Sequence, residues 1–139
     1  MPMTTAMKDA MIDAVYPEMA SAMAYICFGT DGTAAEVTDV ALGTEWTPGN
    51  YPGTPTLRTP VTWTWHASGK YLSASTEIDE TESNSSGGLA EYGYTSTPTI
   101  GIDPTDSLKF RSSTSSALIK HSEVKMKVDT VFYLRVIEF

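Results

Sequence analysis

The sequence predicts a mostly-β domain, an antiparallel β-sandwich or barrel-like fold with a short N-terminal α-helix. Six or seven short segments show strand-like alternation or apolar runs, and turn residues separate them at high density. The chain has no βαβ rhythm and no internal repeat. Its 139 residues, 41% of them hydrophobic, fit a single folding unit with a real core. We divide this unit into an N-terminal helical segment, residues 1–23, and a β domain, residues 24–139.

The N-terminal segment predicts an amphipathic helix over residues 4–16. Apolar side chains recur there at three- and four-residue spacing, and charged side chains occupy the other faces. Thr4 or Thr5 suits the N-cap position. Pro17 is expected to disturb the helix, because proline restricts the backbone before it, and a further turn up to Met23 is left open.

Methionines give this helix an adaptable packing surface, since their side chains are flexible and polarizable. We favour packing against the protein's own sheet. The alternative is an assembly interface with a neighbouring copy, formed by Met7, Met11, Val15 and Met19.

The strand signals lie at Ala24 to Phe28, Thr62 to Trp65, Tyr71 to Ile78, Leu89 to Thr95, Leu108 to Arg111 and Val124 to Val136. Alternation places Trp63 and Trp65 on one face, which we expect to be buried. Four prolines in residues 47–60 predict a segment that runs over a surface or along a sheet edge. A short helical turn is predicted within residues 34–46, and the serine-rich runs at 83–86 and 112–116 are predicted to be flexible loops.

Charge and composition argue against several classes of partner. The 9 basic and 17 acidic residues give a net charge of −8, which disfavours nucleic acid and anionic membranes. Charged residues interrupt the apolar N-terminal stretch, so we expect no signal peptide and no membrane insertion. Cys27 is the single cysteine and lies in an apolar run, where a buried and inert thiol is expected.

No catalytic set, metal site or cofactor site can be assembled from the sequence. His66 and His121 are far apart, and a zinc site needs three or four ligands. Glu77 and Asp79 could serve a glycosidase, but they share strand parity within an acidic cluster for which a solvated face is the better interpretation. We therefore expect no enzyme, with the carboxylate-dependent glycosidase as a remote alternative.

Two aromatic residues are candidates for exposed contact. Trp46 and Tyr51 lie in or near the proline- and glycine-rich loop. Flat rings at such positions suit a glycan- or receptor-binding module, because they stack with little loss of conformational entropy. This module is the alternative to a purely structural role.

The order of segments resembles small virion domains of tailed phages, of the tail-fibre, collar and decoration type. The resemblance begins with YICFGTDGTAAEVTDVALGTEW, which matches an apolar strand, a G-T-G-T turn and an x-D-x-A-L-x-x-E motif. It continues with Arg58 before a central strand, with Glu91 in an E-apolar-G-apolar strand, and with Arg111 in a late strand. It covers most of the chain in order, and the stretches 47–57 and 79–88 depart from it.

This resemblance implies a non-enzymatic structural protein located in the virion after assembly in the host cytoplasm. The expected partners are copies of itself, in a trimer or a ring, other virion proteins and a host surface glycan. The resemblance also singles out four charged residues that stand among apolar or small neighbours: Glu45, Arg58, Glu91 and Arg111. We expect them to form one or two partly buried Glu–Arg pairs that pin loops to the sheet, and scattered surface charges are the alternative.

Overall fold

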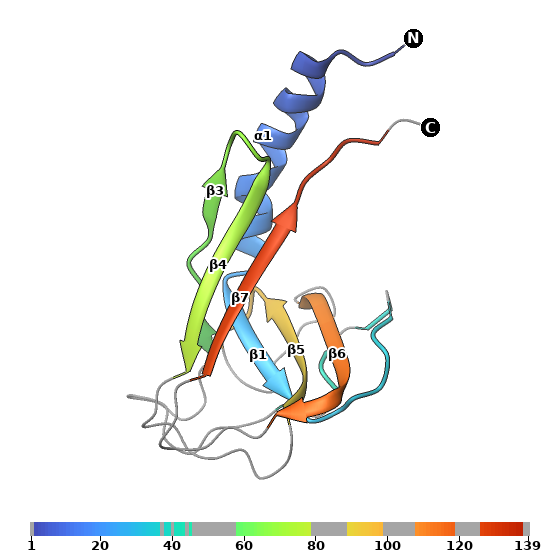
Figure 1. Ribbon diagram of the computed structural model, residues 1–139, viewed down its shortest axis with the longest axis vertical. Helices are drawn as coiled ribbons and strands as arrows, with labels where there is room; N and C mark the ends of the chain where they lie inside the picture. The colour runs from blue at the N-terminus through green and yellow to red at the C-terminus, as the bar shows by residue number, and fades with distance from the viewer. Residues whose placement is uncertain are drawn as a thin grey trace.

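The computed structural model describes residues 2–36, 38–39, 41–43, 45, 58–78, 89–98, 108–118 and 126–137. Within these residues it contains two antiparallel β-sheets and one α-helix at the N-terminus (Figure 1). The predicted mostly-β fold with an N-terminal helix is therefore confirmed. No helix in this part of the chain has the length and apolar content needed to cross a membrane.

Seven strands form the two sheets. The four-stranded sheet has the order β2-β1-β5-β6, where β1 is Tyr25–Gly29, β2 is Thr59–Pro60, β5 is Leu89–Thr95 and β6 is Leu108–Leu118. The three-stranded sheet has the order β3-β4-β7, where β3 is Thr64–His66, β4 is Tyr71–Ile78 and β7 is Met126–Tyr133. Every strand pair is antiparallel.

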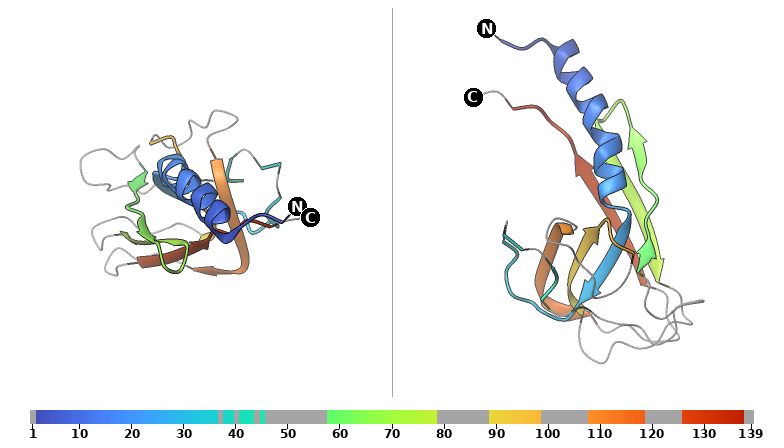
Figure 2. Two further views of the ribbon diagram at one scale, coloured as in Figure 1. Left: turned by 90° about the horizontal axis from the view of Figure 1, so that it is seen from above. Right: turned by 180° about the vertical axis from the view of Figure 1, so that it is seen from behind.

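The two sheets and helix α1, Thr5–Ala22, share one core. Strands β4 and β7 extend beyond the four-stranded sheet, and α1 lies along the part of their inner face that this sheet leaves uncovered (Figures 1 and 2). The core cluster draws on α1's C-cap and on both sheets: it consists of Met23, Ile26, Phe28, Leu89, Tyr94 and Met126. The upper half of the three-stranded sheet therefore depends on the helix for its cover.

Alternation in the strands agrees with the sequence pattern. In β4 the side chains of Leu72, Ala74 and Thr76 are buried, as their shared parity predicts. Trp63 lies edge-on to Tyr94 in the core, and its indole Nε1–H donates to the carbonyl oxygen of Met23 over 2.8 Å. The expected burial of the tryptophan face is thus partial, because Trp63 and Trp65 are both partly buried and neither is fully enclosed.

Helix α1 continues to Ala22, so the turn that the sequence left open beyond Pro17 is helical. Thr4 caps it as predicted, with its Oγ1 accepting the backbone N–H of Met7 at 3.2 Å. A proline inside a helix costs about 3 kcal/mol, since it removes one hydrogen bond and crowds the preceding turn. Packing of Met19 and Met23 against the core after Pro17 outweighs this cost.

The serine-rich run 112–116 lies within β6 and is not a flexible loop. Ser112 pairs with Tyr92 and Ser113 with Glu91, so backbone pairing with the buried strand β5 decides the conformation. Near the C-terminus, β7 ends at Tyr133 and not at Val136 as predicted.

Two segments between the helix and the three-stranded sheet can be compared with their predictions. Thr59–Pro60 forms an edge strand, as the proline-rich composition predicts. The helical turn predicted within residues 34–46 is reduced, among its described residues, to a turn in which Asp39 N–H donates to the Glu36 carbonyl over 3.1 Å. Residues 37, 40, 44 and 46 of that prediction, and the loop at 83–86, lie outside the described part.

A hydrogen bond between the Tyr94 hydroxyl and the Thr130 Oγ1 joins the two sheets inside the core. Burial raises the pKa of Tyr94 to about 12 from its ordinary 10.0, and the bond to Thr130 acts in the opposite direction. As pH rises above 10, the unfolded chain releases this proton before the folded protein does. The stabilising contribution is therefore complete below pH 10 and declines as pH rises toward 12.

We predict that Tyr94→Phe lowers the free energy of unfolding at neutral pH by about 1–3 kcal/mol, because Thr130 loses its buried partner. It should also make the decline of stability above pH 10 shallower than in the unsubstituted protein. Urea unfolding at pH 7, 10 and 11 measures both effects. Tyr133→Phe, whose ring is exposed, should leave stability at pH 7 unchanged; an equal loss in both variants would contradict the assignment.

Candidate functional site

Arg58 and Glu45 form a buried, two-pronged ion pair at one end of the four-stranded sheet. Arg58 Nε donates to Glu45 Oε1 and Nη2 to Oε2, each over 2.7 Å. Arg58 Nη1 donates to the carbonyl oxygen of Thr97 at 2.9 Å. Glu45 also makes a β-bridge with Gly29, the last residue of β1, so this pair ties three separate segments together.

Arg111 and Glu91 form the second pair, between β6 and β5. Nε and Nη2 of Arg111 both donate to Glu91 Oε2, at 3.0 and 2.7 Å. The Glu91 side chain is 0% exposed, and its Oε2 also accepts the backbone N–H of Gly43 at 3.2 Å. A fully buried carboxylate is stable only where such donors replace its lost hydration.

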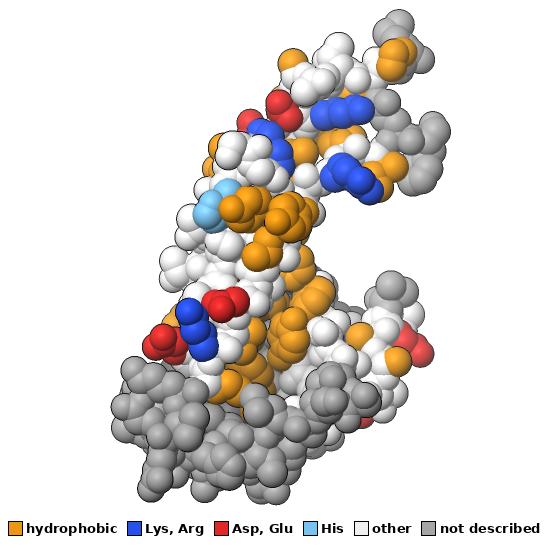
Figure 3. Space-filling model, viewed as in Figure 1, with side chains coloured by type: hydrophobic (Ala, Val, Ile, Leu, Met, Phe, Trp, Pro, Cys, Tyr) orange, Lys and Arg blue, Asp and Glu red, His pale blue; other side chains and the backbone are white. Residues whose placement is uncertain are grey.

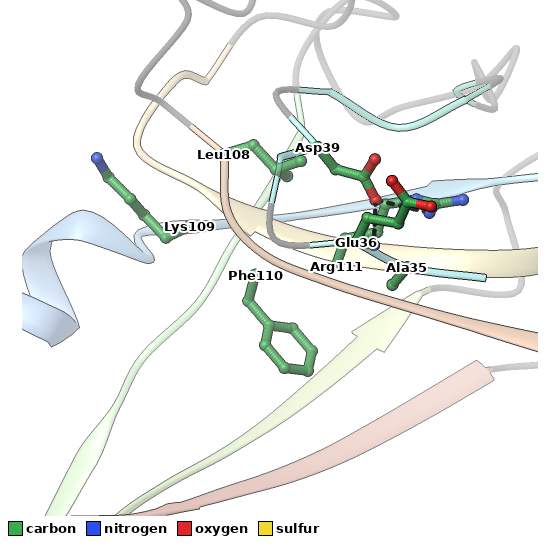
Figure 4. Close-up of a pocket in the computed structure, with 7 residues that line it drawn as sticks. All are labelled: Ala35, Glu36, Asp39, Leu108, Lys109, Phe110 and Arg111. Atoms are coloured by element: carbon green, nitrogen blue, oxygen red, sulfur yellow. Dashed lines mark hydrogen bonds and ion pairs between the residues drawn. The ribbon is translucent and has the colours of Figure 1, made fainter. Parts of the chain in front are cut away.

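The other side of the Arg111 guanidinium holds the segment that follows β1. Nη1 donates to Asp39 Oδ2 over 2.9 Å, and Nη2 donates to the Thr33 carbonyl oxygen over 3.1 Å. Figure 4 shows Asp39 directed toward Arg111, while Phe110 points from the opposite side of β6 toward β4 and β7. We call Arg111, Glu91, Asp39 and the carbonyl groups around them the arginine junction.

The pKa values at this junction reflect its hydrogen bonds. The backbone N–H of Glu36, then the Arg111 side chain, hold the pKa of Asp39 below its ordinary value. Hydrogen bonds from Thr33 lower the pKa of Asp31 in the same way. Burial disfavours the charged form of Arg111, but its bonds to Glu91 and Asp39 outweigh this and raise its pKa. All these charges are therefore retained at neutral pH.

The arginine junction has the geometry of a structural tie. The guanidinium of Arg111 is engaged by two carboxylates and by backbone carbonyls, and it thereby joins β5 and β6 to the residues that follow β1. Across the described residues, no three His, Cys, Asp or Glu side chains are grouped to hold a metal ion. The structure brings the four charged residues singled out in the sequence together as two buried ion pairs, Arg58 with Glu45 and Arg111 with Glu91. They are not scattered over the surface.

The predicted assembly residues divide between two sides of α1. Met7, Met11 and Val15 are exposed, by 54%, 40% and 49%. Ala10 and Ala14 lie exposed between them. We call these five residues the outward face of α1. Met19 is partly buried and packs against the core cluster, so it does not belong to this outward face.

Several other candidate residues lie outside the described part of the chain: Trp46, Tyr51, Asp79 and His121. Glu77 is exposed on β4, opposite Lys127 of β7. His66 stacks on Tyr71 with ring centroids 4.2 Å apart, and its Nε2 shares a 2.8 Å hydrogen bond with Ser73 Oγ.

Two features of the described structure were not predicted from the sequence. The contribution of Asp39 to the arginine junction has no sequence signal, because a turn brings it to a residue 72 positions away. An aromatic row across β3, β4 and β7, formed by His66, Tyr71 and Tyr133, depends on strand register. Alternation alone cannot identify this row, because it does not say which residues of neighbouring strands lie side by side.

We predict that Arg111→Ala lowers the free energy of unfolding by about 3–5 kcal/mol, because it leaves the buried Glu91 carboxylate without its countercharge. Arg111→Lys should recover only part of this loss, since an ammonium cannot reproduce the fork of donors. Urea denaturation at neutral pH measures the difference.

The matched control is Lys127→Ala, which removes an exposed pair with Asp129 at 3.8 Å. Such surface pairs contribute about 0–1 kcal/mol. If Arg111→Ala had no larger effect than this control, the arginine junction would not be a stabilising element.

Comparison with known proteins adds no family to this picture. No protein-family model matches the chain, and no curated protein sequence matches it. Function is therefore argued from the geometry, together with the motifs that resemble virion domains.

Proposed function

We propose that the protein is a non-enzymatic structural subunit of a tailed-virus particle, and that it assembles with copies of itself through the outward face of α1. The observation that carries this proposal is that α1 has two apolar faces and that its own sheet covers only one. Other virion proteins are the further partners that the sequence resemblance implies.

The inner face of α1 is satisfied within the subunit. Ile12 is buried, and Tyr16 stacks on Trp65 with centroids 4.2 Å apart and planes within 4° of parallel. The Nζ of Lys70 also lies 3.6 Å from Oδ1 of Asp13 on the helix. These contacts fix the rotation of the helix about its axis, so the opposite face must point away from the sheet.

The outward face repeats at positions i, i+3, i+4, i+7 and i+8, from Met7 to Val15. This spacing is typical of a helix face that packs on another element. Methionine adapts to a partner surface, and the two alanines allow another helix to approach closely. A helix that served a single subunit would be expected to carry polar side chains here.

The position of α1 suits contact between subunits. It projects past the four-stranded sheet at one end of the molecule, where a second copy can reach it (Figures 1 and 2). Identical faces on identical subunits favour closed symmetric assemblies, which supports the expected trimer or ring. The particle itself is inferred from the motifs around Gly29, Arg58 and Glu91 that resemble virion domains.

We predict that the full chain forms a discrete oligomer and that Met11→Glu converts it to a monomer, because a charge would be buried in the contact. Light scattering after size exclusion, over a range of concentrations, measures the mass. Circular dichroism should show unchanged secondary structure, since Met11 is 40% exposed and does not belong to the core cluster.

Val131→Glu is the matched control, because Val131 is similarly exposed but lies on β7. It should keep the oligomer intact. A strict monomer at high concentration, or an oligomer that survives Met11→Glu, would refute assembly through α1. Labelling of purified particles by an antibody against the chain would test the virion location separately.

A further inference from the structure

The outer face of the three-stranded sheet carries a row of aromatic rings, one from each strand. Strand register places His66 beside Tyr71, and Tyr71 beside Tyr133. The His66 and Tyr71 rings are stacked at 4.2 Å and 15°, and the Tyr71 and Tyr133 rings lie 5.2 Å apart. The last ring of the row, Tyr133, is 73% exposed.

A shallow groove of about 390 Å³ continues along the same face below this row. The buried residues Ala74 and Thr130 contribute to its lining. The other lining residues are mostly small hydroxyl side chains, with one carboxylate: Thr62, Thr64, Ser73, Ser75, Asp129 and Val131. Figure 3 shows hydrophobic side chains beside the histidine on this face, an uncharged area below them and, below that, a small cluster of acidic and basic side chains. The groove and the row together form a surface with flat rings at one end and hydroxyl groups along its length.

Sheet stability alone does not account for this arrangement. Cross-strand aromatic pairs stabilise sheets by about 0.2–1 kcal/mol, which explains the half-buried pair of His66 and Tyr71. The core, however, lies on the other face, where Leu72 and Ala74 are buried. Tyr133 is largely exposed on a strand that forms the edge of its sheet in the described part of the chain, so its ring gains little from burial.

We propose that this outer-face groove binds a neutral saccharide. An exposed flat ring stacks on the apolar face of a sugar, and side-chain hydroxyls exchange hydrogen bonds with its hydroxyl groups. Asp129, whose Oδ1 lies 3.8 Å from Lys127 Nζ, can accept hydrogen bonds from sugar hydroxyls. A peptide strand is disfavoured, because backbone groups in the face of a sheet are already paired within it.

The arrangement also provides a fixed orientation for the rings. Ser73 holds His66 through the 2.8 Å hydrogen bond, and His66 in turn backs the ring of Tyr71. Tyr71 therefore has a defined plane before any ligand arrives, which reduces the entropy lost on binding. Tyr133 would supply the main stacking surface, and Tyr71 would set the edge of the site.

This groove is separate from the outward face of α1, since the helix lies on the opposite face of the same sheet (Figure 2). It also differs from the loop residues Trp46 and Tyr51 that the sequence suggested for glycan contact. A variant that loses saccharide binding can therefore keep its oligomeric state, and a variant that loses self-assembly can keep its saccharide binding.

Saturation-transfer difference NMR on the full chain tests the site with five neutral probes: maltohexaose, cellohexaose, laminarihexaose, chitohexaose and mannohexaose. At least one should receive saturation at its ring protons. Tyr133→Ala should weaken the binding of that sugar about tenfold, because the stacking surface is lost, while Tyr133→Trp should retain it. Asp129→Asn tests whether the carboxylate contributes through its charge.

Met11→Glu is the control, because it alters only the outward face of α1 and should leave the affinity of each site for a single hexaose unchanged. Circular dichroism verifies that each variant is folded. The proposal is overturned if none of the five hexaoses gives a signal at millimolar concentration, or if Tyr133→Ala binds as tightly as the unsubstituted protein.

Discussion

The buried carboxylate of Glu91 is the constraint on which much of the four-stranded sheet depends. It lies on the central strand β5 with no exposure to water, so its charge must be compensated within the protein. Arg111 supplies that charge from β6, and the same guanidinium then reaches the segment 31–39. One cation therefore fixes the pairing of two strands and the course of the chain beyond β1.

Arg58 repeats this arrangement at the other edge of the same sheet. There the fork of donors binds Glu45 and a carbonyl oxygen near the end of β5. Both arginines thus join a strand to a carboxylate from outside the named strands, Asp39 in one case and Glu45 in the other. In a small domain, loops of small and polar residues bury little hydrophobic surface. The hydrogen bonds and ion pairs of an arginine can hold such residues in place where no large apolar contact is available.

Local patterns predicted those parts of the fold that local chemistry controls. Tyr71–Ile78 and Leu89–Thr95 were predicted with the bounds that the structure has, since alternation or an apolar run identifies them without reference to neighbours. The serine-rich half of β6 was missed and the helix beyond Pro17 was left open, because pairing with β5 and core packing decide them. Tertiary contacts override weak propensities of this kind.

The candidate sites show the same division. The four charged residues could be singled out from their apolar neighbours, but which glutamate binds which arginine depends on the folded chain. The exposure of Met7 and Met11, and the packing of Met19, follow from the rotation that Tyr16 and Trp65 impose on α1. Sequence periodicity identifies the faces of a helix and cannot say which of them remains uncovered.

The three-stranded sheet links the two proposed surfaces. Its inner face holds α1 (Figure 1), and its outer face carries the aromatic row and the groove. If subunits associate through α1, the sheets lie outside that contact and their grooves face away from the symmetry axis. Weak saccharide sites repeated in this way bind a multivalent surface about 10²–10⁴-fold more tightly than one site alone, provided that they can engage together. Assembly through the helix would then be what makes a shallow groove useful as an adhesive site.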